Sequence, residues 1–214
     1  MQEGPSDAQA KNYTNSLCRH GTLPANASRN FSRPAEIVTK ITQEDWFKES
    51  KDAVEIGSGC LRNSMFLLEK GIHVAVWESP TVISRYEKVY ENFRKSGGVV
   101  MNKLERAEHD FAIITFVLET ICPELSRRRL LGNTRRMLKD GGRLVLGVRS
   151  FYDVKTANDT GVYCPIGRGY RTPIKTFIKP YGIRSLSRIL RATRFRVEKV
   201  YTHSPILNLV AKAS

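Results

Sequence analysis

The stretch that decides the fold reads AVEIGSGCLRNS over residues 53–64. An apolar run leads into a turn with two glycines, a helical pattern follows, and a second apolar run ends at Trp77-Glu78. Glycines let the backbone turn tightly beneath a ligand, and an acid about twenty residues later can hydrogen-bond the hydroxyls of a ribose. This layout is typical of a site for the adenosine part of a cofactor.

Two classes of adenosine cofactor use a turn of this kind. A dinucleotide site needs the pattern G-x-G-x-x-G, because the pyrophosphate rests on the N-terminus of the helix. Here Arg62 stands where the third glycine would be. Glu55, inside the turn, would repel a pyrophosphate but suits a cationic methionine group. The turn therefore favours S-adenosylmethionine (SAM) over a dinucleotide.

Apolar runs alternate with helical patterns along the rest of the chain. Strands are expected at 53–56, 72–77, 98–101, 111–117 and 143–148, with helices from Ser32, 61–71, 79–97, 123–141 and 183–192 between or after them. Alternation of this kind predicts an α/β fold with a parallel sheet covered by helices on both faces. Two closing strands, 195–201 and 206–211, are joined by a short turn at Ser204-Pro205.

From these residues the chain resembles the class I SAM-dependent methyltransferases over about 37–214. Their turn reads acid-x-Gly-x-Gly-x-Gly; Glu55, Gly57 and Gly59 match it, and Leu61 replaces the third glycine. The resemblance implies one Rossmann-like domain with a mostly parallel seven-stranded sheet whose last strand is antiparallel.

Two narrower resemblances rest on short motifs. The segment Gly59 to Ser64, with Trp77-Glu78, looks like tellurite-resistance-type methyltransferases. Ser32-Arg33-Pro34, Trp77 to Pro80 and Thr176-Phe177-Ile178-Lys179 are similar to putative methyltransferases associated with DNA phosphorothioation. Either group implies SAM as the cofactor.

The resemblance also implies a cofactor site. Glycines of the turn would lie beneath the methionine and ribose, Glu55 near the ammonium group, Glu78 at the ribose hydroxyls and Ser79 beside the adenine. The residues carried over are Glu55, Gly57, Ser58, Gly59, Glu78, Ser79, Asn102, Thr115 and Phe116. Three of them have a structural alternative: Glu55 could cap a neighbouring helix, Glu78 could be an exposed acid at the end of a strand, and Thr115 could be an ordinary strand residue. Arg62 and Asn63 are expected to be solvated residues at the start of a helix.

The charge of the chain is strongly positive and uneven. The formal net charge is +14, and from Gly161 to Ser214 the only acid is Glu198. A field of this sign attracts phosphate, so DNA or RNA bound through the basic C-terminal region is one expected partner. A basic but indifferent surface, or a small anionic substrate, explains the same charge.

The chain is expected to carry an N-terminal arm over 1–33, and one methyltransferase domain over 34–214 that includes a substrate-facing insertion at 150–182. Rings and guanidinium groups in these segments could stack on a base and neutralise phosphate, or cover a small heteroaromatic molecule. The candidate substrate residues are His20, Arg33, Tyr152, Tyr163, Arg168, Tyr170 and Arg171. No catalytic residue is assigned; His20 is a candidate base.

Three functions stay open: a methyltransferase for nucleic acid or a nucleic-acid-linked substrate, a methyltransferase for a small molecule, and a protein that binds SAM without turnover. No Asn-Pro-Pro-Tyr motif follows the fourth strand, so methylation of a base amino group of the usual DNA type is not supported.

The four dispersed cysteines predict no metal site and fit a reducing cytoplasm. No run is apolar and long enough to span a membrane.

Overall fold

The structure of the chain is a computed structural model. It describes residues 32–214 apart from 153, 156–163, 167–168, 174 and 204–205. The predicted arm therefore lies outside the described residues except for Ser32 and Arg33, and so do three candidate substrate residues, His20, Tyr163 and Arg168.

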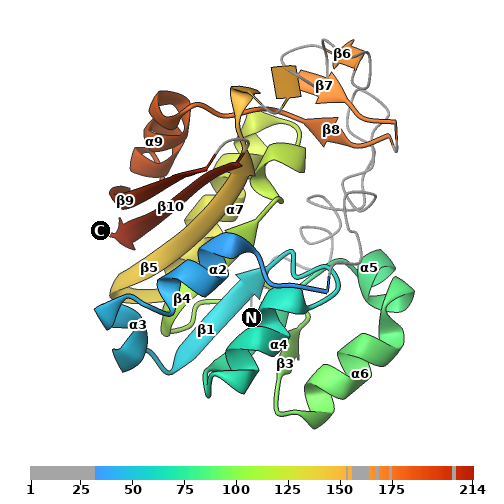
Figure 1. Cartoon of the computed structure of the whole chain (residues 1–214), viewed down its shortest axis with the longest axis vertical. Coiled ribbons are helices and arrows are strands. Elements are labelled where there is room, and N and C mark those ends of the chain that lie inside the picture. Colours follow the sequence, from blue (N-terminus) through green and yellow to red (C-terminus); the bar gives the residue numbers. More distant parts are fainter. Residues whose placement is uncertain (1–31, 153, 156–163, 167–168, 174, 204–205) are drawn as a thin grey trace, which may run out of the picture.

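A seven-stranded sheet forms the centre of the molecule, in the order β3-β2-β1-β4-β5-β10-β9 (Figure 1). Its strands are β1 (Asp52–Ile56), β2 (His73–Trp77), β3 (Val99–Met101), β4 (His109–Thr115), β5 (Leu138–Arg149), β9 (Phe195–His203) and β10 (Ile206–Ala213). β1 pairs in parallel with both β2 and β4, and β10 lies antiparallel to β5 and β9. The predicted mostly parallel sheet with an antiparallel last strand is confirmed.

Helices cover both faces of this sheet. Along the chain they are α2 (Glu36–Ile41), α3 (Asp45–Glu49), α4 (Arg62–Glu69), α5 (Pro80–Arg85), α6 (Glu87–Lys95), α7 (Glu124–Arg136) and α9 (Ile183–Arg191), with a short 3₁₀ turn η2 (Leu118–Thr120). One apolar cluster joins the sheet to α7 and α9, and a second joins it to α2, α3, α4 and α6. The central strands are buried at nearly every position, and because successive side chains point to opposite faces, the sheet has a core on each face.

Three boundaries differ from the sequence expectation. The first helix begins after Ala35, so Ser32 is not its cap. The single helix expected from Ser79 to Gly97 is two helices, because the backbone leaves helical geometry at Tyr86, with φ −117° and ψ 30°. α7 ends at Arg136, and β5 begins at Leu138, before the glycines that were expected to separate them.

The segment 150–182 contains a small sheet that periodicity did not predict. Its strands are β6 (Cys164–Ile166), β7 (Gly169–Arg171) and β8 (Phe177–Ile178), all paired antiparallel. Strands of two or three residues are too short to show alternation, so the sequence pattern carries no signal for them. In Figure 1 this small sheet stands above the carboxyl ends of the central strands.

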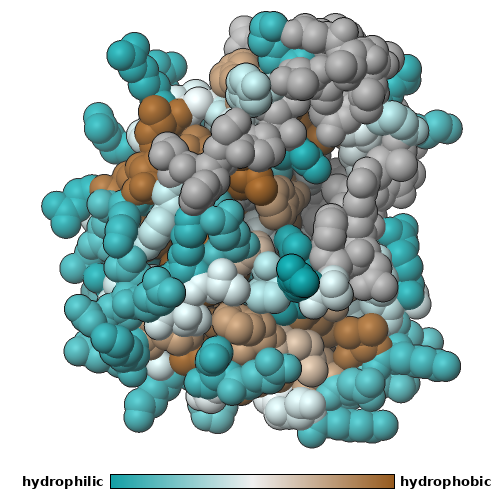
Figure 2. All heavy atoms as spheres, in the orientation of Figure 1, coloured by the Kyte–Doolittle hydropathy of each residue, from teal (hydrophilic) through white to brown (hydrophobic). Residues whose placement is uncertain are grey.

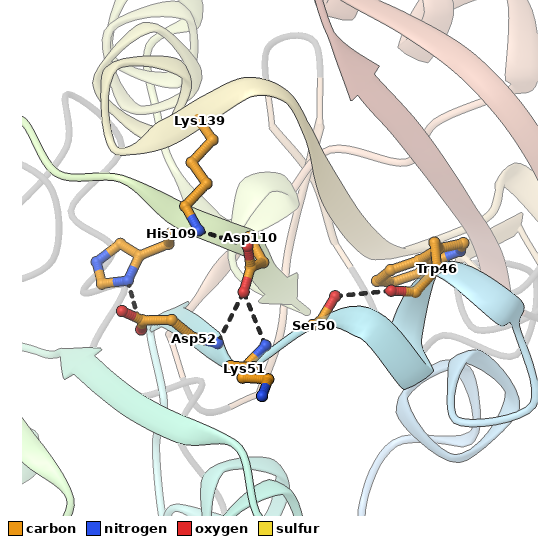
Figure 3. A network of polar contacts seen from close by, with 7 residues as sticks. All are labelled: Trp46, Ser50, Lys51, Asp52, His109, Asp110 and Lys139. Atoms are coloured by element: carbon orange, nitrogen blue, oxygen red, sulfur yellow. Dashed lines mark hydrogen bonds and ion pairs between the residues drawn. The ribbon is translucent and has the colours of Figure 1, made fainter.

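A polar network holds the opposite, amino-terminal edge of the central sheet (Figure 3). The carboxylate of Asp110 accepts the backbone N–H groups of Lys51 and Asp52 at 2.7 and 3.0 Å, and the Lys139 ammonium at 2.8 Å. His109 Nδ1 lies 2.8 Å from Asp52 Oδ1. The network joins the starts of β1, β4 and β5, so it fixes the strands whose other ends form the candidate site.

Among the helices of the described residues, none combines the length and the apolar composition that a membrane span requires.

Candidate functional site

The glycine turn after β1 is built from backbone conformations that favour glycine. Gly57 and Gly59 have φ of +75° and +56°, in the left-handed region that a side chain disfavours. A Cβ on Gly57 would also lie 2.3 Å from Cγ2 of Val117. The turn is therefore packed directly against the segment that follows β4, which brings the ends of β1 and β4 together.

Leu61 keeps the conformation of the glycine that it replaces. Its φ is 64° and its ψ 17°, at the N-cap of α4. The side chain is fully buried in the apolar cluster beneath α2, α4 and α6. The leucine therefore changes the core behind the turn and leaves the backbone path of the turn intact.

Glu78, at the end of β2, holds the turn from one side. Its carboxylate accepts the backbone N–H of Gly59 at 2.9 Å and that of Ser79 at 2.6 Å. Ser79 in turn caps α5, where its Oγ accepts the N–H of Val82 at 3.3 Å. A carboxylate has about four acceptor positions, so Glu78 can still accept hydroxyl groups of a ligand while it holds the loop.

Tyr90 of α6 holds the turn from below. Its ring is fully buried, but its hydroxyl donates to the carbonyl of Gly59 at 2.9 Å and lies 2.9 Å from Oγ of Ser58. Its helical spacing from Val82 and Phe93 indicates a core residue and does not reveal these contacts. Since the polar tip contacts two of the predicted cofactor residues, it also positions the site.

Asn63 is a second positioning residue, which the sequence pattern did not indicate. It is buried, so the expectation of a solvated residue is wrong. Its amide nitrogen donates to Glu55 at 2.7 Å and to Thr115 Oγ1 at 3.1 Å, and its amide oxygen accepts the N–H of Ala35 at 2.7 Å. One side chain thereby links β1, β4, α4 and the start of α2.

Glu55 is buried beneath the first turn of α4, where Asn63 and the Ser64 hydroxyl donate to its two oxygens. Burial raises the pKa of Glu55 to about 7, against the hydrogen bonds of Ser64 and Asn63, which lower it. Burial likewise raises the pKa of Glu78 above its usual range. The two carboxyl groups also repel each other. A cationic ligand at the turn would relieve both effects, whereas a pyrophosphate would add to them.

The end of β4 carries the other predicted cofactor residues. Thr115 is buried and held by Asn63, and Phe116 follows it with φ of +60°. The guanidinium carbons of Arg62 and Arg149 lie 5.8 and 6.0 Å from the centre of the Phe116 ring. Cations near an aromatic ring at this distance are attracted to its face. Positive charge therefore lies where β4 and β5 end.

The remaining predicted residues are less closely tied to the site. Asn102 follows β3 and is exposed. Arg33 is exposed, and its carbonyl accepts Arg62 Nη1 at 3.2 Å. Tyr152 is 68% exposed, and Tyr170 and Arg171 lie in β7 of the small sheet. Among the described residues, no group of His, Cys, Asp and Glu side chains could hold a metal ion.

No protein-family model matches the chain, and no curated protein matches it. Solved structures do. A 1,6-didemethyltoxoflavin-N1-methyltransferase from Burkholderia thailandensis, with bound S-adenosylhomocysteine (SAH), has a TM-score of 0.65 and 14% identity over 83% of this chain and 76% of that one. A SAM-dependent methyltransferase from Methanosarcina mazei has a TM-score of 0.63 and 18% identity, over 85% of this chain and 98% of that one.

An O-methyltransferase family protein from Burkholderia thailandensis also matches, with a TM-score of 0.65 and 13% identity over 83% of this chain. This chain spans only 55% of its length. At these identities the similarity establishes the fold. The chain has the Rossmann-like fold of SAM-dependent methyltransferases, with the turn, the two acids and the end of β4 at the edge where α/β folds bind their ligands.

Proposed function

We propose that this chain is a SAM-dependent methyltransferase and binds SAM at the carboxyl ends of β1, β2 and β4. One observation carries the proposal: the buried carboxylate of Glu78 hydrogen-bonds the N–H of Gly59 at 2.9 Å, directly across the glycine turn. An acid in this position can accept the two hydroxyls of a ribose that lies over the turn.

The acidic side chains at the turn suit the positive charge of SAM. Two buried carboxyl groups, Glu55 and Glu78, both have raised pKa values because of burial. SAM carries a sulfonium and an ammonium group and supplies, when bound, an electrophilic methyl group to a nucleophile in line with it. Glu78 would hold the ribose, and Glu55, through Asn63 or directly, would favour the cationic end.

The end of β4 would orient the acceptor. Thr115 is fixed by Asn63, and two guanidinium groups lie 5.8 and 6.0 Å from the centre of the Phe116 ring. Holding two reactants close and aligned supplies much of the rate of a displacement reaction. The positive charge of Arg62 and Arg149 favours an acceptor, or a part of it, that is anionic.

Two acceptor classes remain in the proposal. The net charge of +14 favours nucleic acid or a nucleic-acid-linked substrate. The solved structure of similar fold that is named for 1,6-didemethyltoxoflavin favours a small heteroaromatic molecule instead. The narrower resemblance to phosphorothioation-associated methyltransferases fits the first class, and the one to tellurite-resistance-type methyltransferases does not favour it. Both rest on short motifs alone.

Calorimetry with SAM and SAH tests the cofactor site. Glu78→Gln keeps the volume of the side chain but removes its charge, and we expect at least a tenfold loss of affinity, because hydrogen bonds to a charged group contribute about 1.5–3 kcal/mol. Glu87→Gln, an exposed acid at the start of α6, is the matched control and should bind like the wild type. Failure of the intact protein to bind either compound would refute the proposal.

A further inference from the structure

The outward face of α9 carries three arginines on one side of the helix. Arg184, Arg188 and Arg191 are spaced by four and three residues, so they lie on one side of the helix, about 6 and 4.5 Å apart along its axis. All three are exposed, and none makes an ion pair with any described residue. The opposite side of α9, with Leu186, Ile189 and Leu190, is buried in the core.

These arginines line a hollow on the surface. The hollow has a volume of about 530 Å³, and its lining consists of Ile183, Arg184, Ser187, Arg188, Arg191 and Ala192. The stretch from Gly161 to Ser214 has only one acid, Glu198, whose carboxylate lies 3.0 Å from Nε of Arg143 on β5. Its negative charge is therefore already paired. Figure 2 shows hydrophilic side chains projecting from the edge of the molecule where Figure 1 places α9.

Exposed apolar groups adjoin the start of the same helix. Ile183 is 41% exposed and Phe151 58%. The Phe151 ring lies beside Gly182, since a Cβ on that glycine would be 3.7 Å from the ring. Tyr152 is also exposed, next to Phe151 in the chain. Phe151 therefore places an exposed ring beside the start of the helix that carries the three arginines. Rings and guanidinium groups are the components with which proteins bind unpaired nucleotides.

We propose that the arginine face of α9, defined by Arg184, Arg188 and Arg191, binds the phosphodiester backbone of single-stranded nucleic acid, with a base stacked on Phe151. A guanidinium group pairs with phosphate oxygens through two parallel hydrogen bonds. Three such groups along one helix present donors to consecutive phosphates. This binding does not depend on methyl transfer, so it stands or fails separately from the proposed function.

A membrane surface fits this face less well. A helix that lies on a bilayer inserts its apolar side among the lipids, but the apolar side of α9 is already packed against the sheet. Only Ile183 is apolar and exposed at more than a third on the helix itself. Charge complementarity with a polyphosphate chain is what the exposed side offers.

Fluorescence anisotropy with labelled oligonucleotides of about 16 nucleotides tests the proposal. Single-stranded RNA and DNA of one mixed sequence are compared with a duplex, at about 50 and about 200 mM salt. The triple variant Arg184→Gln, Arg188→Gln, Arg191→Gln replaces the three guanidinium groups of this face with neutral amides. The matched control is Lys88→Gln, Arg94→Gln, Lys95→Gln, which removes three exposed charges from α6 on the other face of the sheet.

We expect the α9 variant to lose at least tenfold in affinity for single strands at about 50 mM salt, and the control to change by less than about twofold. The slope of log affinity against log salt should fall by about 2, because each lost phosphate contact contributes about 0.7 for a single strand. The charge-conserving triple Arg→Lys variant should keep most of the binding. An unchanged urea unfolding transition, followed by tryptophan fluorescence, verifies that the α9 variant is folded.

Three results would overturn the proposal. The first is wild-type protein that shows no salt-sensitive binding to single strands. The second is an equal loss in the α9 variant and the α6 control, which would mean that net charge alone is responsible. The third is tighter binding to phosphatidylserine vesicles than to oligonucleotides, with the same dependence on the three arginines, which would make the face a membrane contact.

Discussion

Leu61 provides the sharpest test of how the turn is held. A residue other than glycine in the left-handed region costs about 1–2 kcal/mol, and Leu61 has φ of 64°. Its side chain is fully buried, and truncation of a buried leucine to alanine costs about 3–5 kcal/mol. The burial of the side chain therefore outweighs the strain of the backbone.

This balance predicts an unusual order of two variants. Leu61→Ala loses the buried side chain and keeps the strain, so it should lower the free energy of unfolding by about 3–5 kcal/mol. Leu61→Gly loses the same side chain but relieves the strain, so we expect it to be about 1 kcal/mol more stable than the alanine variant. Urea denaturation followed by tryptophan fluorescence measures both.

Leu67 is the matched control, because it is equally buried but lies inside α4 in helical geometry. There the order should reverse, with glycine about 1 kcal/mol less stable than alanine. SAH affinity of Leu61→Gly should stay within about threefold of the wild type, since the side chain faces the core. If glycine is no more stable than alanine at position 61, the strain inferred from the backbone is refuted.

Three further changes test the network around the turn. Glu55→Gln should gain stability relative to the wild type as the pH rises, by roughly 3 kcal/mol in all. The folded pKa of Glu55 is about 7 and its unfolded value is 4.5, so ionisation of the buried carboxyl group destabilises only the wild type. Urea titrations at about pH 4.5 and pH 8 measure this gain, and a difference between the two proteins that does not change with pH would contradict it. Tyr90→Phe removes the hydroxyl that contacts Ser58 and Gly59 and should cost about 1–2 kcal/mol by urea titration and weaken SAH binding several-fold by calorimetry. Asp110→Asn should cost about 1–3 kcal/mol by urea titration and leave SAH affinity unchanged, because it lies at the opposite edge of the sheet; a large loss of SAH affinity would show that the two edges are coupled.

Much of the fold follows from local patterns, because the strands at the centre of the sheet are largely apolar runs between turn residues. The glycine turn was predictable for the same reason: Gly57 and Gly59 stand where the backbone needs positive φ. The break at Tyr86 was not, since Val82, Tyr90 and Phe93 are all buried and continue one helical stripe across it. Periodicity records which side of a helix is buried, and it carries no record of a change in axis.

The candidate site was predictable in its acids and much less so in the residues that position them. Apart from the hydrogen bond of Asn63 to Glu55, Asn63 and Tyr90 act through contacts 28 to 52 residues apart in the chain. Nothing in a local window distinguishes a tyrosine whose hydroxyl reaches a glycine turn from one that only fills the core. The assignment of Asn63 as solvated failed for the same reason: the burial of a polar residue depends on partners from other elements, here Ala35 and Thr115.

The departure at Leu61 and the retention of both acids have one physical explanation. The turn needs left-handed backbone at position 61, and it receives that geometry from the core packing of the leucine instead of from a glycine. Glu78 and Tyr90 then fix the turn at Gly59, and Asn63 fixes the start of α4 to β1 and β4. Because these three supports contact backbone and side chains other than Leu61, its substitution need not alter the surface that faces the ligand. The residue that breaks the motif therefore bears on the stability of the domain, and the acids bear on the proposed cofactor site.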